Sequence, residues 1–397
     1  MSARAFDLTA ARAETPGCAE VLHFNNAGAG LMPDPVLAAV KDHLDLEARI
    51  GGYEAAARNH DAIERVYGAV AELINCAPDE VAVIENATRA WDMAYYALAR
   101  TFKPGDRVLT AEAEYVSNYL AILQTAKASG ASVEVVPCDN TGQVSLAALE
   151  EMMDERVRLI ALTHVPTQGG LVNPAAAVGA VARKLDALYL LDACQSAGQV
   201  PLDVAAIGCD MLSATGRKYL RGPRGTGFLY VRRDLIEKLE PPFIDLHAAE
   251  WTSTHDYKIR ADARRFENWE CYYAGKLGLG VAIDYALAWA IETTYARLQG
   301  LAADLRAGLA SVPGVAVHDL GAEKGGIVTF TLAGQDPQSL HGTLAAQGIN
   351  TSVSPLNYAR LDLERRGLDA MVRASLHYYN SEDEVARFLG AIEDLAD

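Results

Sequence analysis

LYLLDACQSAG, residues 188–198, is a short apolar run that ends on a carboxylate, Asp192. The next apolar run, residues 210–215, leads into GRKYLRGPRGTG, which puts Lys218 just past a strand end among glycines and three arginines. A buried carboxylate is costly unless it meets a cation or a strong donor, and a lysine near like charges has a lowered pKa. Taken singly, Asp192 predicts a helix cap or an ion pair, and Lys218 predicts a basic surface loop.

Further apolar runs precede and follow these two segments. Stretches with the apolar spacing of a helix lie between several of them. We expect helices over residues 91–99, 119–128 and 176–185. Apolar runs without polar alternation are typical of strands buried on both faces. The pattern therefore predicts an α/β fold with a mostly parallel sheet whose ligands bind beyond the strand ends. The seven expected strands are VAVIE, RVLTA, SVEVVP, VRLIALTHV, LYLLDA, DMLSAT and TGFLYV.

The pattern changes after Trp269. One long helix is expected over residues 274–298, followed by strands near 315–318, 327–332 and 372–376. Ser381 begins a final amphipathic helix in capping-box spacing with a glutamate. We expect a large domain over residues 16–284 and a small α+β domain over 285–397, with residues 1–15 packing on the small one.

Composition excludes several classes of protein. Lys and Arg number 35 against 52 Asp and Glu, a net charge of −17, and no long basic run is present, so nucleic acid and anionic membranes are not expected partners. The six cysteines form no CxxC pair, which predicts neither a metal site nor a disulfide framework. Such cysteines predict a reducing cytoplasm, and neither a signal peptide nor a membrane segment is expected.

Asp192 and Lys218 together indicate a chemistry that neither residue indicates alone. A lysine that forms an imine with an aldehyde and a carboxylate that holds a pyridine nitrogen protonated are the two ends of pyridoxal phosphate (PLP) chemistry. Ala87 and Thr88 follow a predicted strand and open a helix, so their amides and the helix dipole suit a phosphate. Alternatively, Thr88 is an ordinary N-cap.

Several ordered motifs resemble one family over nearly the whole chain. They are ENATRA, EYVSN, THVPTQGGLVNP, DACQSAGQ, ATGRKYLRGPRGTGFLYV, RRFENWE and VRASLHYYNSEDEV. The chain resembles the class V aminotransferase family of fold-type I PLP enzymes, especially its cysteine desulfurase, C–S lyase and isopenicillin-N-epimerase-like branches. The resemblance implies a seven-stranded large domain, a homodimer and an amino-acid substrate.

The resemblance also implies a role for each matching residue. Lys218 would form the Schiff base with PLP, and Asp192 would pair with its pyridinium nitrogen. Gln195 would approach the phenolic oxygen with Thr167 near the same edge, while Tyr115 would stack on the ring. The phosphate would be held by Ala87, Thr88, Thr215 and Arg217, and the substrate by Arg373, Asn26 and Ala27.

Arg373 matches the arginine that grips a substrate carboxylate with two prongs, for which its fork suits it better than lysine. The alternative is a surface ion pair. Asn26 and Ala27 resemble an N-terminal loop that closes on the substrate.

Departures from the family bear on the reaction. Desulfurases carry a nucleophilic cysteine on a loop before the substrate arginine, yet residues 350–369 contain none. Cys271 lies in another segment, and Cys194 is expected to be buried as a small apolar residue. Trp269, in RRFENWE, either fills part of the pocket or alters a subunit contact.

Two histidines are considered as well. His164 lies either beside the cofactor or packed in the core, and His377 with Tyr378 is expected to be structural.

These features favour a PLP-dependent β-elimination, a C–S lyase reaction that resembles a desulfurase without its persulfide cysteine. Transamination and isopenicillin-N-epimerase-like racemisation are alternatives. A dinucleotide oxidoreductase would need a GxGxxG turn, which NNAGAGLMP does not supply. A non-catalytic PLP-binding module is a further alternative. The sequence does not identify the amino acid or any sulfur-accepting partner.

Overall fold

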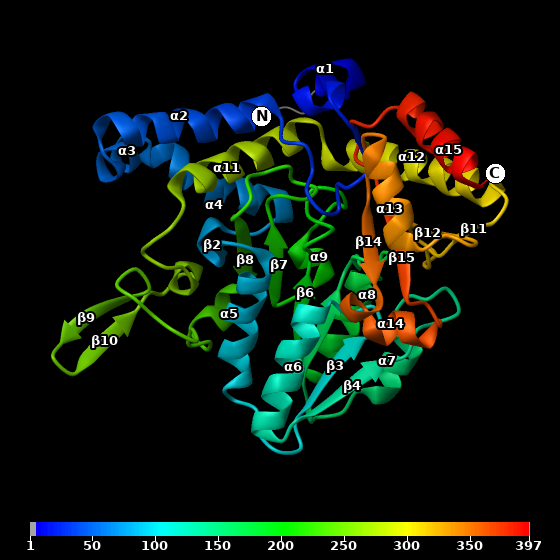
Figure 1. The fold of residues 1–397 in the computed structure, drawn as a ribbon. Helices are drawn as coiled ribbons and strands as arrows, with labels where there is room; N and C mark the ends of the chain where they lie inside the picture. The colour runs from blue at the N-terminus through cyan, green and yellow to red at the C-terminus, as the bar shows by residue number, and fades with distance from the viewer. Residues whose placement is uncertain (1–4, 397) are drawn as a thin grey trace.

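The structure, a computed structural model, describes residues 5–396, and its centre is a seven-stranded sheet (Figure 1). The order across the sheet is β2-β8-β7-β6-β5-β3-β4, and the neighbouring pairs are parallel except for the two that involve β8. The expected mostly parallel seven-stranded sheet is confirmed. The strands are β2 (Val81–Ile84), β3 (Arg107–Ala111), β4 (Ser132–Val136), β5 (Val157–Thr163), β6 (Leu188–Asp192), β7 (Met211–Thr215) and β8 (Gly227–Val231).

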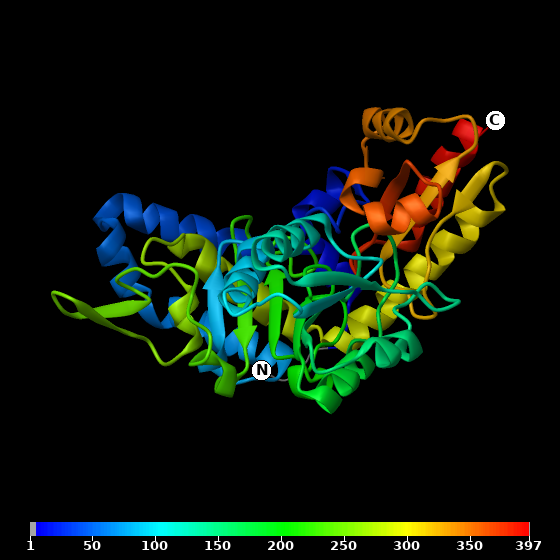
Figure 2. The same cartoon turned by 90° about the horizontal axis from the view of Figure 1, so that it is seen from below.

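Helices cover both faces of this sheet, which explains why its strands are continuous apolar runs (Figure 2). One face packs against α4 (His60–Ile74), α8 (Ala175–Ala182) and α11 (Tyr273–Ala288). The other packs against α5 (Ala87–Ala99) and α6 (Val116–Ser129). The other helices of this part are α2 (Asp34–Ile50), α3 (Gly52–Arg58), α7 (Leu146–Met152), α9 (Val204–Ile207) and α10 (Arg233–Ile236).

A smaller antiparallel sheet, in the order β11-β12-β15-β14, forms the C-terminal part. It packs with α12 (Ile291–Ser311), α13 (Pro337–Ala346) and α15 (Glu382–Ala396) around a separate apolar core. The expected capping box is confirmed, because the amide of Glu384 donates to Ser381 Oγ and the amide of Ser381 to the Glu384 carboxylate. Its strands are β11 (Val315–Val317), β12 (Ile327–Leu332), β14 (Ser352–Pro355) and β15 (Ala370–Ser375), with α14 at Arg360–Arg365.

Two short pairs of strands complete the fold. β1 (Leu22–His23) pairs in parallel with β13 (Ile349–Asn350) and so ties the N-terminal segment to the C-terminal part. β9 (Ala249–Ser253) and β10 (Asp256–Ile259) form a hairpin that extends from the body in both ribbon views (Figures 1 and 2). Short 3-10 turns lie at Pro16–Ala19, Pro78–Glu80, Arg183–Leu185, Ala263–Phe266 and Leu356–Tyr358.

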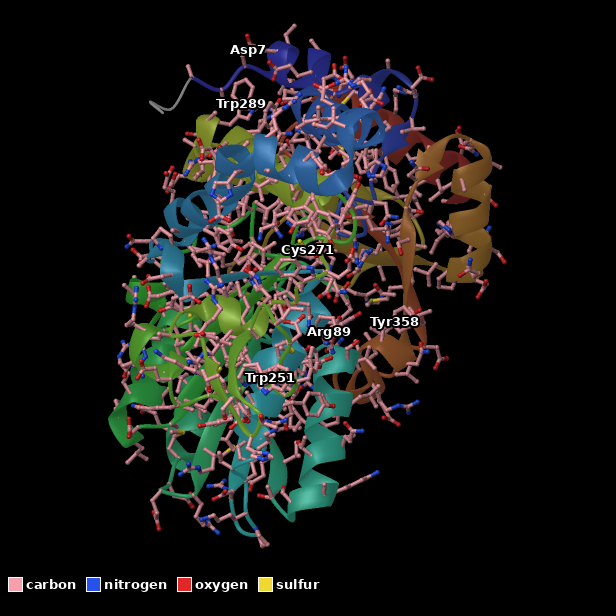
Figure 3. The ribbon with its side chains drawn as sticks, turned by 90° about the vertical axis from the view of Figure 1, so that its left-hand side faces the viewer. Asp7, Arg89, Trp251, Cys271, Trp289 and Tyr358 are labelled. Atoms are coloured by element: carbon pink, nitrogen blue, oxygen red, sulfur yellow. The ribbon has the colours of Figure 1, made fainter. Side chains whose placement is uncertain are left out.

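The N-terminal helix α1 (Leu8–Ala13) lies against the C-terminal part. Arg12 donates to the carbonyl of Tyr379 at 3.0 Å and to the carboxylate of Glu384 at 2.9 Å. Phe6 packs edge-on to Trp289 with ring centroids 5.6 Å apart, and Figure 3 shows that tryptophan below the N-terminal segment. Residues 1–4 of the predicted N-terminal segment and residue 397 lie outside the described residues, and the boundary at 284 stays a prediction.

The single helix predicted over residues 274–298 is wrong. Trp289 and Ala290 separate α11 from α12, which meet at 77°. Ala290 has φ +59°, and Trp289 is buried in the cluster that includes Tyr285. Neither glycine nor proline marks the break, so the apolar spacing continues across it. Within residues 5–396 no single helix is both long and apolar enough to cross a membrane; only this bent pair, taken together, reaches that length.

The strained backbone at Ala290 leads to a stability prediction. A residue with a Cβ is disfavoured at φ +59°, ψ +111°, so Ala290→Gly is expected to raise the free energy of unfolding by about 1 kcal/mol. Chemical denaturation of both proteins measures the difference. Asp186→Gly is the matched control, because Asp186 has φ +55° in the left-handed region that aspartate tolerates, and its gain is expected to be smaller. Equal gains would contradict the explanation.

Candidate active site

A pocket opens at the carboxyl ends of β5, β6 and β7, beside the start of α5. It encloses about 520 Å³ of empty space, part of it open to solvent, which is a usual size for a small-ligand site. The nine residues predicted to hold the cofactor all line it, although they come from five separate segments. They are Ala87, Thr88, Tyr115, Thr167, Asp192, Gln195, Thr215, Arg217 and Lys218.

Asp192 is the last residue of β6 and is buried. Its Oδ1 accepts from the amide of Cys194 at 2.8 Å, and its Oδ2 accepts from Asn118 Nδ2 at 2.9 Å. Burial raises the pKa of its carboxyl, while these two bonds and the charge of Lys218 act in the opposite direction. Within residues 5–396 no cation forms an ion pair with it, so its carboxylate is available toward the pocket.

Lys218 is buried, which rules out the surface-loop interpretation. Its Nζ donates to Cys194 Sγ at 3.2 Å. Burial is the main cause that lowers the pKa of its ammonium, and the charge of Arg217 lowers it further. The three arginines therefore do not act together as expected, because Arg221 turns away and donates to the Leu31 carbonyl at 2.7 Å.

The start of α5 presents free amides to the pocket. Asn86 is the N-cap, since its side chain accepts from the amide of Arg89 at 3.0 Å. Thr88 is therefore not the cap, and the amides of Ala87 and Thr88 are among the first-turn donors that have no partner within a helix. Arg217 lies across the pocket and donates to the carbonyl of Gly28. This arrangement of amides and a cation suits an anion such as phosphate.

Arg373 lies on β15, beside the same pocket, and is buried. Its Nη1 donates to Thr167 Oγ1 at 2.6 Å and to the Thr167 carbonyl at 3.1 Å, and its Nη2 donates to Asn25 Oδ1 at 3.3 Å. Its Nε has no hydrogen-bond partner among residues 5–396, and burial lowers the pKa of its guanidinium to about 10. No carboxylate of residues 5–396 pairs with it, so the surface ion-pair alternative is wrong.

The N-terminal loop contacts the site through Asn25 and Ala27, whereas the resemblance implies Asn26 and Ala27. Ala27 accepts from Gln195 Nε2 at 3.1 Å through its carbonyl, and Gln195 also contacts Thr167 Oγ1 at 3.3 Å. Asn26 does not line the pocket, because its side chain donates to the Ser375 carbonyl at 2.8 Å and accepts from Tyr379. Its neighbour Asn25 contacts Arg373 instead. The proposed loop closure stays a prediction.

Sequence reasoning gave no role to several residues near the pocket. Cys194 lines it and contacts Lys218, so it is not simply a buried apolar residue. Asn118 also lines it and contacts Asp192. Glu114 lies behind Asn118, within the motif EYVSN. The four-residue spacing of Glu114 and Asn118 at a strand end was the available signal.

The two histidines have different surroundings. His164 is buried between two pocket residues of the chain but does not line the pocket itself. Burial lowers the pKa of its imidazole to about 4, and its Nδ1 has no partner within the described chain. His377 contacts the Tyr219 carbonyl at 3.0 Å through Nε2 and accepts from the amide of Tyr378 at 2.9 Å. These contacts suit the structural role expected of His377 and Tyr378, which stays a prediction.

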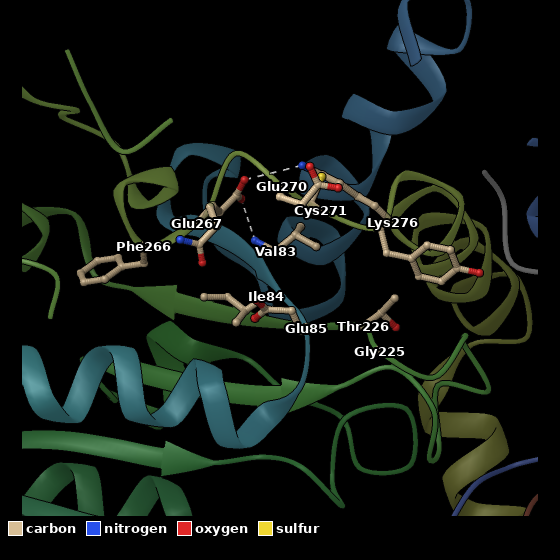
Figure 4. Close-up of a pocket in the computed structure, with 12 residues that line it drawn as sticks. Val83, Ile84, Glu85, Gly225, Thr226, Phe266, Glu267, Glu270, Cys271 and Lys276 are labelled. Carbon is tan, nitrogen blue, oxygen red and sulfur yellow. Dashed lines mark hydrogen bonds and ion pairs between the residues drawn. The ribbon is translucent and has the colours of Figure 1, made fainter. Parts of the chain in front are cut away.

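A second pocket lies beside the first, between the end of β2 and the segment RRFENWE (Figure 4). Glu267 accepts there from the amide of Val83 at 2.7 Å and lies 3.6 Å from Lys276 Nζ. Cys271 lines this second pocket and not the candidate site. Trp269 does not line the candidate site and is 44% exposed, so the subunit-contact alternative is the one that stays a prediction.

Known proteins are similar to this chain in sequence and in fold over most of their length. A family model described as aminotransferase class-V matches residues 22–388. A probable cysteine desulfurase of Pyrococcus abyssi is 28% identical and is matched over 97% of this chain and 96% of its own. A cysteine desulfurase of Pectobacterium atrosepticum is 30% identical, with 91% of each chain covered.

The fold comparison agrees with the sequence comparison. The apo structure of a cysteine desulfurase from Thermococcus onnurineus superposes with a TM-score of 0.93 at 27% identity and covers 99% of both chains. The fold-type I expectation is thus confirmed by a solved structure. The match over residues 22–388 and the shared fold lead to one conclusion: the chain belongs to the aminotransferase class-V family.

Proposed function

We propose that this chain is a PLP-dependent enzyme that acts on a sulfur-containing L-amino acid by β-elimination. The observation that carries the proposal is that the buried side chains of Lys218 and Asp192 line one pocket, beside a helix start with free amides. The donor set fits the cofactor: the amides at 87 and 88 with Arg217 suit its phosphate, Asp192 suits its ring nitrogen, and Lys218 suits its aldehyde. Gln195 Oε1 is buried and has no hydrogen-bond partner in the described chain, so it can accept a hydrogen bond from a group bound in the same pocket.

When bound, PLP supplies an aldehyde for the substrate amine and a protonated ring that accepts the electron pair left at Cα. Asp192 would hold the proton on the ring nitrogen, and its burial would strengthen that bond because a carboxyl with a raised pKa is the stronger base. Lys218 would take the Cα proton, since its lowered pKa increases the share of neutral amine. Tyr115 would cover the ring, and Thr215 would complete the phosphate site.

Arg373 binds the substrate carboxylate in this proposal. A buried guanidinium without a carboxylate partner is strongly stabilised when an anion binds, because folding has already removed the guanidinium from water. Thr167 and Asn25 hold its two Nη atoms, which orients the fork before the substrate enters. Gln195, Ala27 and Asn26 belong to the loop and turn that flank this position.

The reaction is inferred from the similarity to cysteine desulfurases and from the absence of cysteine between residues 350 and 369. That range forms β14, a 3-10 turn and α14, next to the strand of Arg373. Without a thiol there to take sulfur, we infer that the Cβ–S bond breaks by elimination. Water then completes the conversion of cysteine to pyruvate, ammonia and hydrogen sulfide.

A product assay tests the reaction. Purified protein loaded with PLP is incubated with cysteine, cystine and cysteine S-conjugates, and pyruvate, alanine and sulfide are measured. From cysteine we expect pyruvate and sulfide in equal amounts without alanine. Cystine is expected to give pyruvate and cysteine persulfide, and an S-conjugate to give pyruvate and the corresponding thiol. Alanine as the product would instead indicate desulfurase chemistry, exchange with a keto acid would indicate transamination, and a D-amino acid would indicate racemisation. Each of these results would overturn β-elimination while keeping the cofactor.

We also infer that the protein is a homodimer, as the family resemblance implies, and that it works in the cytoplasm, as its cysteine pattern predicts. Support for a subunit contact comes from the exposed aromatic residues of the projecting hairpin and of RRFENWE. They are Trp251 at 79%, Tyr257 at 48% and Trp269 at 44% exposure. Analytical ultracentrifugation measures the assembly, and a monomer at micromolar concentration would refute it.

A further inference from the structure

Glu114 is a buried carboxylate directly behind the candidate active site. It is 3% exposed, and it is not among the residues that line the pocket. Its Oε1 accepts from the amide of Tyr115 at 2.7 Å, from Asn118 Nδ2 at 3.0 Å and from Thr163 Oγ1 at 2.5 Å. Its Oε2 accepts from Thr110 Oγ1 at 2.8 Å. Four donors therefore satisfy a carboxylate that no cation of residues 5–396 neutralises.

Asn118 connects this carboxylate to Asp192. The Nδ2 amide nitrogen of Asn118 has two hydrogens, and it donates to Glu114 Oε1 at 3.0 Å and to Asp192 Oδ2 at 2.9 Å. Because both hydrogens are used, the amide plane is fixed between the two carboxylates. The orientation of Asp192 therefore depends on where Glu114 holds that amide.

Glu114 acts at three adjacent strand ends. Thr110 belongs to β3, Thr163 to β5 and Asp192 to β6, and these strands are neighbours in the sheet. Burial and the nearby charge of Asp192 raise the pKa of the Glu114 carboxyl to about 6, although the bonds from Thr163, Tyr115 and Asn118 oppose that rise. An apolar residue would fill this position without the cost of desolvating a carboxylate. The acidic group therefore has a role beyond packing.

We propose that Glu114 is a positioning residue for the cofactor: through the Asn118 amide it holds Asp192 toward the ring nitrogen. It also places a second negative charge behind that contact, which favours the protonated ring. The bond to the amide of Tyr115 fixes the start of α6 at the same time. This inference rests on the proposed function, because it assumes that Asp192 meets PLP.

The test uses the PLP-loaded protein and the variant Glu114→Gln. Glutamine keeps an acceptor for the donors at Oε1 and removes the charge. We expect the variant to lose its cofactor about tenfold faster on dilution, the effect of a pKa change of one unit at the ring nitrogen. The imine that PLP would form with Lys218 is expected to absorb violet light, so the decay of this violet band measures the rate. The melting temperature of the cofactor-free proteins measures stability.

A double-mutant cycle separates positioning from stability. If Glu114 acts through Asp192, Glu114→Gln is expected to change the rate of cofactor loss by less than about twofold in an Asp192→Asn background. Asn118→Ser, which leaves Glu114 intact but cannot bridge the carboxylates, is expected to behave in the same way and serves if Glu114→Gln does not fold. Thr110→Val is the matched control: it removes one bond to Glu114 and is expected to lower only the melting temperature.

An equal effect of Glu114→Gln in both backgrounds would overturn the proposal, as would unchanged cofactor loss in the otherwise native protein. These results differ from a failure of the proposed function. In that case the native protein itself would show no violet band with PLP, whatever residue occupies position 114.

Discussion

Lys218→Ala is expected to remove the violet absorption band and to lower turnover by at least about a thousandfold. The amine is the only group proposed to bond covalently with the cofactor and to take the Cα proton, and loss of a nucleophile and base that act as one unit has effects of this order. Absorbance of the PLP-treated protein, before and after borohydride, gives the first measurement. The rate of pyruvate formation from cysteine gives the second.

Lys184→Ala is the control for this variant. Lys184 forms an exposed pair with Glu150, so its removal is expected to leave the band and the rate unchanged. If Lys218→Ala kept a band that borohydride bleaches, another amine would hold the cofactor. The assignment of Lys218 would then be wrong, even if the product assay still found pyruvate.

Arg373→Met is expected to raise KM for cysteine on the order of 100-fold and to change kcat much less. Removing one partner of a buried, hydrogen-bonded charge pair has an effect of this size, and the pair forms only when substrate binds. Arg373→Lys, which keeps the charge but loses the fork, is expected to raise KM about tenfold. Steady-state kinetics over a range of cysteine concentrations measure both changes.

The same variant also gives a prediction about stability: Arg373→Met weakens substrate binding but is not expected to destabilise the fold. Arg373 is buried without a carboxylate partner in the described chain, so its replacement by methionine removes a desolvated charge. The melting temperature of Arg373→Met is therefore not expected to fall. Arg156→Met provides the comparison, because Arg156 is exposed and paired with Asp154. A rise in KM with an equal loss of stability would mean that Arg373 supports the fold and not the substrate.

Much of the large sheet is predictable because its strands are buried on both faces. Such strands form apolar runs that are recognisable without knowing their partners. The residues of β8 do not reveal that it is antiparallel to its neighbours, because an apolar run such as TGFLYV suits parallel and antiparallel pairing equally well. The break at Trp289 and Ala290 is also hidden, because the apolar spacing continues through it and a buried indole decides the turn.

The candidate site shows the same limit at the level of side chains. Asp192 and Lys218 stand out because each is an ionisable residue at or just past the end of an apolar strand. The direction of Arg221 away from Lys218 depends on tyrosines more than 60 residues downstream, which no local pattern reveals. The bridge from Glu114 to Asp192 likewise requires three strands to be neighbours in space.

The cavity is lined by the large sheet and flanked by a part of the chain that folds around a different core. Its Lys218 belongs to a connection whose ends meet where the amide of Gly216 donates to the Thr226 carbonyl at 2.9 Å. Arg373, beside the cavity, comes from the small sheet and is bonded to the N-terminal loop. Protein engineers can therefore exchange the flanking part by grafting β14 and β15 from a relative, with the aim of retargeting the catalyst to another amino acid while its reactive centre is inherited intact.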